Sequence, residues 1–155
     1  MFLRRPLDGS LSLGGKRIFG SNKTWLGLVV MSLTTTFVGS LIWSGSQHFR
    51  EILPFNTLFT AIAGFFVVGL AYSIGELPNS FMKRRLSIPS GQLLDNKYRV
   101  LFEVIDLIDG IVLAGLVYLV VLLVSLKYVV CAVAIGILVH WLVHLLMIRL
   151  SLKKR

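Results

Sequence analysis

FNTLFTAIAGFFVVGLAYSI, residues 55–74, decides the fold, because twenty consecutive residues carry no charged side chain. A helix rises about 1.5 Å per residue, so roughly 20 residues cross the ~30 Å hydrocarbon core of a bilayer. Similar apolar runs occupy residues 25–43, 106–126 and 128–148. None shows strand-like alternation, and backbone groups in lipid must be satisfied within the protein. The sequence predicts an all-α integral membrane protein, a bundle of about four transmembrane helices with a loop at 75–105.

The composition excludes a water-soluble domain, since 55% of the 155 residues are hydrophobic and only 15% are charged. The net charge is +9. The basic residues lie between apolar runs and not along one soluble face, so membrane lipids and anionic nucleotides are expected partners, and nucleic acid is not. No linker or repeat divides the chain, which is expected to form a single membrane domain over residues 1–155.

The distribution of basic residues predicts the orientation. Of the sixteen Lys and Arg residues, all but Arg50 and Lys127 lie in the N-terminal segment, in the loop at 75–105 and its flanks, or at the C-terminus. Four crossings place these three regions on one side, and the positive-inside rule makes that side cytoplasmic. We therefore expect a multi-pass protein of the cell (inner) membrane with both termini in the cytoplasm. No cleavable signal peptide is expected, because charges and glycines precede the first apolar run.

The first polar candidate is the segment GSNKTWLG at residues 20–27, where the first membrane helix begins. Lys23 and Thr24 beside small residues at a helix N-terminus can hold phosphate, because free N–H groups and the helix dipole favour an anion there. The alternative is structural, with Thr24 as the helix cap and Lys23 as an interfacial anchor.

The second candidate, GELPNSFMKRR at residues 75–85, follows the second apolar run directly. It combines an acid, an amide, a hydroxyl and three cations, a mixture suited to a polyphosphate and its metal ion. Lys83 to Arg85 alone could be a positive membrane anchor. Glu76 and Asn79 do not assist anchoring.

The third candidate is acidic: Glu103, Asp106 and Asp109 are spaced by three residues and share one helical face. Such acids repel one another unless a cation lies among them, so a metal site is expected, although carboxylates in a first helical turn also favour the dipole. His140 and His144 lie one turn apart, a spacing that permits metal ligation. Without a third ligand, packing and interhelical hydrogen bonds are the expected roles.

Taken in order, the three segments resemble the CDP-archaeol synthase family, relatives of phosphatidate cytidylyltransferase, in a bacterial-type form. Residues 15–27, GKRIFGSNKTWLG, are similar to that family's G-x-R-x-x-G-x-x-K-T-W-R-G segment. Residues 75–86, GELPNSFMKRRL, are similar to its G-[DE]-x-x-x-S-F-x-K-R-R-L segment, and residues 106–109, DLID, match its D-Q-L-D. Leu26 and Leu107 replace the arginine and the glutamine, and the family's additional N-terminal membrane helix is expected to be missing.

The resemblance implies an enzyme of phospholipid biosynthesis that transfers CMP from CTP to a membrane lipid phosphate, giving a CDP-activated lipid and pyrophosphate with Mg²⁺. It implies a catalytic set of Asp106, Asp109 and Lys83. It also implies metal ligation by Asp106, Asp109 and Glu76. The implied nucleotide- and phosphate-binding residues are Lys23, Thr24, Asn79, Ser80 and Arg84. A homodimer is expected by analogy with the relatives.

Two other functions compete with this reading. A CDP-alcohol phosphotransferase shares the beginning D-x-x-D-G at residues 106–110, but Leu113 and Ala114 stand where its A-R would follow, and no later acid completes its metal set. A non-catalytic adaptor or small transporter explains the topology but not the acids beside phosphate-type cations.

Overall fold

The structure is a computed structural model that describes residues 2–88 and 99–150. It consists of helices with one small hairpin, and the elements follow in the order η1 (Phe2–Arg4), β1 (Ser12–Leu13), β2 (Lys16–Arg17), α1 (Trp25–Gly45), α2 (Gln47–Ile52), α3 (Leu58–Arg85), α4 (Arg99–Leu116), η2 (Val117–Val121) and α5 (Leu126–Arg149).

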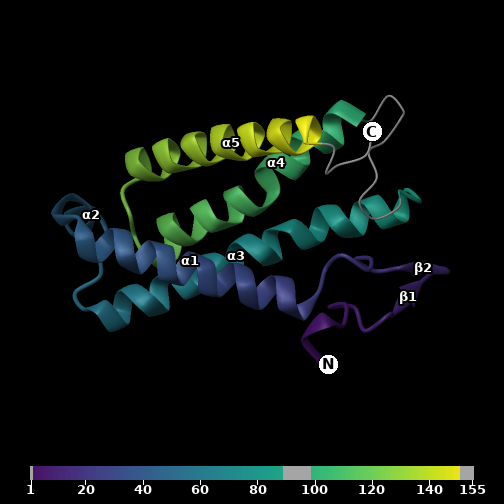
Figure 1. Cartoon of the computed structure of the whole chain (residues 1–155), viewed down its shortest axis with the longest axis horizontal. Coiled ribbons are helices and arrows are strands. Elements are labelled where there is room, and N and C mark those ends of the chain that lie inside the picture. Colours follow the sequence, from purple (N-terminus) through teal and green to yellow (C-terminus); the bar gives the residue numbers. More distant parts are fainter. Residues whose placement is uncertain (1, 89–98, 151–155) are drawn as a thin grey trace.

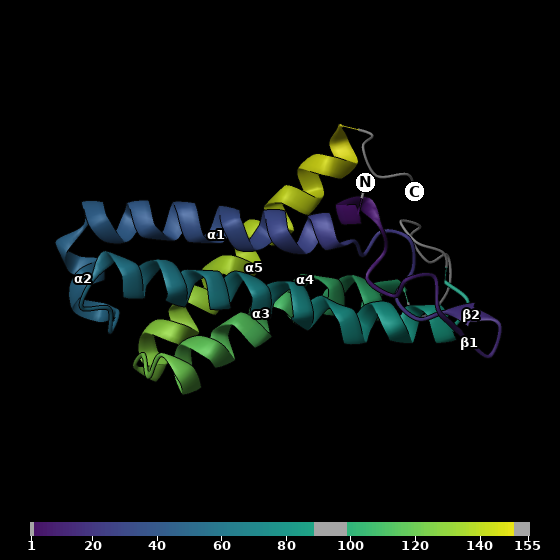
Figure 2. The ribbon, with the colours of Figure 1, turned by 90° about the horizontal axis from the view of Figure 1, so that it is seen from below.

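Four helical spans within the described residues are long and apolar enough to cross a membrane. They run back and forth, so that the hairpin, the end of α3 and the end of α5 lie at one end of the bundle, whereas α2 lies at the other (Figures 1 and 2). Much of their surface is exposed apolar side chain, as expected where lipid surrounds a helix. The prediction of an all-α bundle with about four transmembrane helices is confirmed.

The helix boundaries differ from the predicted ones around the loop at 75–105. The predicted helix at 55–74 is α3, which continues to Arg85, and the predicted helix at 106–126 starts earlier, as α4 at Arg99. A prediction from hydropathy ends each helix at the first polar residues. The backbone hydrogen bonds of the helix can continue beyond that point. Glycine and proline usually indicate the end of a helix, yet Gly75 and Pro78 both lie inside α3. Proline and glycine are tolerated in membrane helices because their surroundings compensate.

Close packing joins α1 and α3. A Cβ at Gly69 would lie 2.7 Å from the Ser32 Cα, and a Cβ at Gly39 would overlap the Phe65 ring. Ser32 is completely buried at this contact. Small residues at these positions let the two backbones approach closely.

The far end of the bundle holds an aromatic cluster. The rings of Trp43, Phe55 and Phe65 pack edge to face, with centroids 6.4 Å and 5.3 Å apart for the successive pairs. Gly64 makes room for Phe55, since a Cβ there would overlap the ring. Such pairs add to the burial of their apolar surface, and they stabilise the end opposite the hairpin.

The third span does not remain α-helical to residue 126. It changes to the π-helical turn η2 at Val117 and ends at a tight turn in which Leu123 has a φ of +52°. The α5 helix then starts at Leu126 and packs against α4, where a Cβ at Gly136 would meet Ile111 at ordinary contact distance, 3.5 Å.

Candidate active site

The α3 and α4 helices cross at two glycines. A Cβ at Gly75 would lie 2.7 Å from the Asp109 carbonyl oxygen, and a Cβ at Gly110 would lie 2.9 Å from the Tyr72 carbonyl oxygen. Neither neighbour is a flexible side-chain end, so any larger residue would push the helices apart. The glycines thus bring the polar residues one turn further along α3 into reach of α4.

Asn79 lies one turn after Gly75 and joins two of the predicted acids. Its Nδ2 donates to Asp106 Oδ1 at 2.6 Å and to Asp109 Oδ2 at 2.9 Å. The side chain is buried, with 5% of the residue exposed. The other Asp109 oxygen accepts the Gly110 backbone N–H at 2.7 Å. One amide therefore holds two carboxylates at a common point between the helices.

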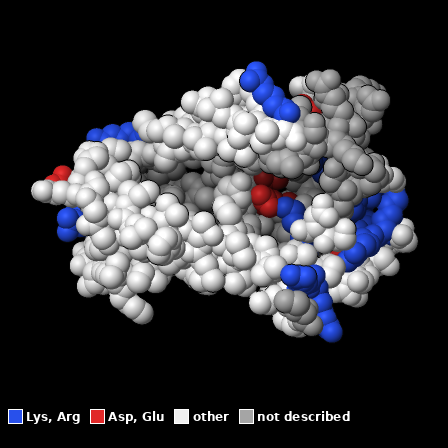
Figure 3. Space-filling view, viewed as in Figure 1, with Lys and Arg blue, Asp and Glu red and all other residues white. Residues whose placement is uncertain are grey.

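Lys83, a further turn along α3, forms an ion pair with Asp106. Its Nζ lies 2.5 Å from both carboxylate oxygens and 5.7 Å from the Phe102 ring centroid. Lys23, just before α1, forms a second ion pair with Glu76. All four side chains are partly exposed. Figure 3 shows acidic atoms beside basic ones where this face of the molecule is hollowed. The three predicted segments thus meet at one end of the bundle.

Two further predicted residues have defined places. The Thr24 hydroxyl accepts the Gly27 backbone N–H at 3.1 Å, so it caps α1. This is the structural role weighed as the alternative to phosphate binding. Ser80 follows Asn79 on α3 and is partly buried.

The predicted metal ligands are only partly brought together. Among the described residues, no three His, Cys, Asp or Glu side chains form a group suited to a metal ion. Asp106 and Asp109 share Asn79, whereas Glu76 is paired with Lys23. Asp106 and Asp109 also lie about two and three turns into α4, not in its first turn, so capping of the helix dipole does not explain them.

An unsatisfied atom at this place fits a cation. The Oδ1 of Asn79 is buried and, among the described residues, has no hydrogen-bond partner. Mg²⁺ prefers oxygen ligands from carboxylates and amides. Asp106, Asp109 and the Asn79 amide oxygen together offer that donor set.

Asp8, to which sequence reasoning assigned no role, organises the N-terminal segment. Its side chain is fully buried, and its oxygens accept Arg17 Nη2 at 2.6 Å and the backbone N–H groups of Ser10, Phe19 and Gly20 at 3.0–3.2 Å. Burial alone would raise the pKa of Asp8, but these donors lower it below its ordinary value. In the sequence, the only indication that Asp8 organises this segment is its position next to Gly9 in a polar stretch.

Arg85 joins the hairpin to the end of α3. Its guanidinium donates to the carbonyl oxygens of Leu13, Lys16 and Arg17, the last two at 2.8 and 2.7 Å. In return, Lys16 Nζ donates to the Arg85 carbonyl at 2.9 Å. Arg85, which its sequence position suggests is a membrane anchor, therefore also stabilises the tertiary contact between the hairpin and α3.

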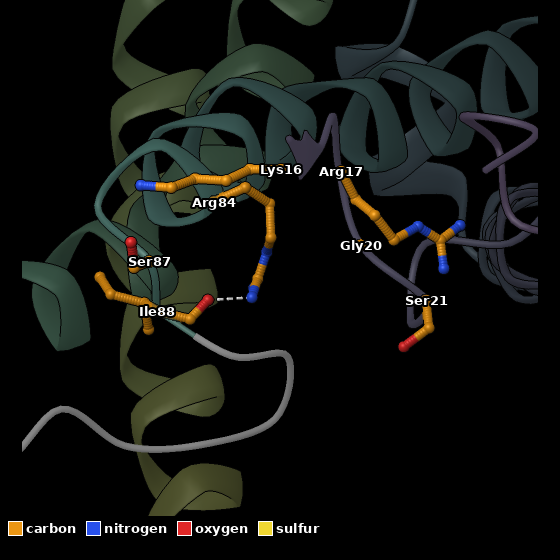
Figure 4. A pocket seen from close by; sticks show the side chains of 7 residues that line it. All are labelled: Lys16, Arg17, Gly20, Ser21, Arg84, Ser87 and Ile88. Carbon is orange, nitrogen blue, oxygen red and sulfur yellow. Dashed lines mark hydrogen bonds between the residues drawn. The ribbon is translucent and has the colours of Figure 1, made fainter. Parts of the chain in front are cut away.

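A pocket of about 250 Å³ lies between the hairpin segment and the end of α3. Its lining residues are Lys16, Arg17, Gly20, Ser21, Arg84, Ser87 and Ile88. Figure 4 shows Arg84 reaching from α3 toward the Ile88 carbonyl, while Arg17 and Ser21 come from the hairpin side. Of the predicted phosphate-binding residues, Arg84 alone lines this pocket.

The histidines of α5 lie outside this cluster as far as it is described. The Nδ1 of His140 is buried without a hydrogen-bond partner among the described residues, so the interhelical hydrogen bond expected of it is not formed at that nitrogen. The side chain of His144 lies outside the described part of the chain.

Fold and site together define a multi-pass membrane protein with a cluster of carboxylates, an amide and cations at one end of its helices. The sequence matches the family described as CarS-like, CDP-archaeol synthase, over residues 4–155. The chain belongs to the CDP-archaeol synthase family, which confirms the prediction of this family and of an enzyme.

Several curated proteins are similar to the chain. The CDP-archaeol synthase of Pyrobaculum islandicum is 30% identical over 153 residues, which cover 98% of this chain and 82% of the relative. Those of Thermococcus kodakarensis and Pyrococcus abyssi are 35% and 36% identical over 88 and 87 residues, 56% of this chain and about half of each relative. No solved structure gives a significant match.

Proposed function

We propose that the protein transfers CMP from CTP to a membrane lipid phosphate, releasing pyrophosphate in an Mg²⁺-dependent reaction. The observation that carries the proposal is the Asn79 bridge between Asp106 and Asp109 beside the Lys83–Asp106 pair. Family membership supports it, since the relatives are named CDP-archaeol synthases.

The chemistry requires little covalent participation by the protein. An oxygen of the lipid phosphate attacks the α-phosphorus of CTP, and the bond from that phosphorus to the α,β-bridging oxygen breaks, so pyrophosphate leaves. Catalysis of such a displacement consists largely of positioning and charge stabilisation. In this reaction Lys23 and Lys83 would bind phosphate oxygens, and Asn79 would orient the carboxylates.

Asp106 and Asp109, with the Asn79 amide oxygen, would hold Mg²⁺, and Glu76 is a further candidate ligand. Bound there, the ion would neutralise charge on the phosphates between which the transfer takes place. With Mg²⁺ held by these residues, Lys83 would no longer serve as the counterion of Asp106, and its ammonium would be available for a phosphate. The same exchange applies to Lys23 and Glu76. We expect metal and nucleotide to bind more tightly together than either does alone.

The position of the cluster suits a lipid substrate. It lies toward the end of two apolar helices, in the last part of α3 and the first part of α4, and the phosphate of a bilayer lipid lies near the ends of such helices. We place this end on the cytoplasmic side, where CTP is available, because the positive-inside pattern favours that orientation.

The decisive test uses purified protein in detergent with Mg²⁺, CTP and a mixture of ester- and ether-linked lipid phosphates. Release of pyrophosphate together with a cytidine-labelled lipid, abolished by chelation, is the expected result. Release of CMP from a CDP-lipid and an alcohol, with no pyrophosphate from CTP, would instead establish a CDP-alcohol phosphotransferase. Absence of both reactions and of CTP binding would favour a non-catalytic role.

A further inference from the structure

We infer that residues 2–5, which comprise η1 and Arg5, form an interfacial anchor that binds the head groups of anionic phospholipids beside the start of α1. The lipid bound there is a component of the bilayer and not the substrate, so the inference does not rest on the proposed function. It assigns a partner to a segment that the candidate active site does not use.

The anchor is held at the depth of the membrane boundary. The first membrane-spanning helix begins at Trp25, and tryptophan is enriched where a span meets the head groups. The Phe2 ring stacks on Trp25, with centroids 6.3 Å apart and planes 23° apart. The Trp25 backbone N–H donates to the Arg5 carbonyl at 3.2 Å. Figure 1 shows the N-terminal segment beside the start of α1. Residues 2–5 therefore lie where lipid head groups meet the protein.

The apolar side chains of the anchor are exposed. Phe2 is 64% exposed, Leu3 44% and Trp25 40%. Neighbouring exposed apolar side chains usually mark a surface that another molecule covers. At the membrane boundary the bilayer itself can cover them, and segments that lie in this boundary combine Phe, Trp and Leu with Lys and Arg. The composition of residues 2–5 matches that pattern.

The charge of the anchor is not compensated within the protein. Arg4 and Arg5 are exposed, and neither forms an ion pair with a carboxylate among the described residues. The nearest acid in the sequence, Asp8, is buried and paired with Arg17. The Arg5 guanidinium lies 6.0 Å from the Phe2 ring centroid, which places a cation beside an apolar group. Guanidinium groups bind phosphate oxygens bidentately, so a lipid phosphodiester is the complementary partner.

The first experiment measures which lipid binds beside Trp25. The full chain with Trp25 as its only tryptophan, obtained by Trp43→Phe and Trp141→Phe, is placed in phosphatidylcholine bilayers. Quenching of Trp25 fluorescence by brominated phosphatidylglycerol is compared with quenching by brominated phosphatidylcholine. Phosphatidylglycerol is an anionic phosphodiester without a terminal phosphate, so it is not a substrate of the proposed reaction.

We expect phosphatidylglycerol to bind more tightly than phosphatidylcholine, and added salt to reduce the difference. Arg4→Gln with Arg5→Gln should remove most of this preference, on the order of fivefold for each arginine near an anionic surface. Arg50→Gln, on α2 at the opposite end, is the matched control and should keep the preference. Both arginines of the anchor are exposed, so the double variant should keep its thermal unfolding midpoint. A preference that survives in the double variant would come from other cations and would overturn the inference.

The second experiment measures depth and leaves the tryptophans unchanged. A nitroxide label on Leu3→Cys, with Cys131→Ser, should be more accessible to oxygen, which dissolves in the bilayer, than to a water-soluble nickel chelate. The matched control is Leu13→Cys. Leu13 is an exposed leucine of β1, which lies beyond the start of α1 at the end of the molecule (Figure 1), and its label should show the reverse.

Two outcomes of the depth measurement would also overturn the inference. A label at Leu3 that the nickel chelate reaches as easily as the label at Leu13 would place the anchor in water. A label shielded from both reagents would mean that protein, such as a second copy of the chain, covers the segment in place of lipid. Neither experiment uses CTP or a lipid phosphate, so failure of the proposed function would leave both results unchanged.

Discussion

Lys83 and Asp106 form an ion pair at 2.5 Å between α3 and α4, so that a cation expected to bind phosphate and an acid expected to hold metal neutralise each other. The Asp106 side chain is 38% exposed and that of Lys83 is 16% exposed, so added ligands can reach this pair. If metal and phosphate bind here as proposed, this ion pair must open to admit them.

Neutralising the acids should abolish turnover without unfolding the protein. Asp106→Asn or Asp109→Asn should lower turnover at least about 10²-fold, on the scale of a lost electrostatic contact in the transition state. A pyrophosphate-release assay measures this, and thermal unfolding in detergent checks the fold. Glu51→Gln, an acid on α2 that contacts Gln47, is the matched control and should leave turnover unchanged. Near-normal turnover in both aspartate variants would remove the metal assignment.

Removing either lysine should weaken nucleotide binding. Lys23→Ala and Lys83→Ala should each cost on the order of 1–3 kcal/mol of CTP binding in the presence of Mg²⁺, the range for hydrogen bonds to charged groups. Titration with CTP measures this loss directly. Lys127→Ala, at the start of α5, is the control. Equal affinities in all three variants would show that these lysines serve only their ion pairs.

The contact between α3 and α4 should not tolerate a methyl group. Gly75→Ala places a Cβ 2.7 Å from the Asp109 carbonyl oxygen, so we expect destabilisation of about 1–3 kcal/mol, as in overpacked cores, together with loss of turnover. Gly136→Ala, which meets Ile111 only at 3.5 Å, should be tolerated. Thermal unfolding of the two variants in the same detergent gives the comparison, and equal midpoints would contradict the close contact.

The N-terminal segment should depend on the charge of Asp8. Because donors lower the pKa of Asp8 in the folded protein, its contribution to stability is fully present above its ordinary value of 3.8 and is lost as the pH falls further, through the lowered value. At neutral pH, Asp8→Asn should therefore raise amide exchange over residues 10–20, with little change in α1. Unchanged exchange in this segment would show that Asp8 does not hold it.

The orientation of the chain is open to a direct test. Reporters fused after Ser46, between α1 and α2, should report the outside, and reporters fused after the C-terminal Arg155 should report the cytoplasm. Placement of Ser46 in the cytoplasm would reverse the topology and separate the proposed site from CTP.

Much of this structure could be predicted from apolar runs and residue chemistry. The run at 25–43 gave the first span to within two residues of its end, and the segments containing Lys23, Asn79 and Asp106 do meet. The C-terminal boundary of α3 could not be predicted, because glycine and proline, here Gly75 and Pro78, destabilise helices in water. Only the position of Asp109 on α4 shows that Gly75 is a contact residue.

The ion pairs between distant segments were the other feature that could not be predicted. The sequence shows that Lys23, Glu76, Lys83 and Asp106 are charged, but not that each cation finds an acid from a distant segment. Asp8 was equally hidden, since its partners are mostly backbone N–H groups, which every residue carries. A homodimer stays a prediction.

The Arg85 clamp imposes an order on biosynthesis. The carbonyls of Leu13, Lys16 and Arg17 leave the ribosome about seventy residues before the guanidinium that binds them. The N-terminal segment is therefore made first but completed only after α1 and α3 have both been inserted. A nascent chain released before Arg85 would lack these three hydrogen bonds, so its hairpin would not be tied to α3.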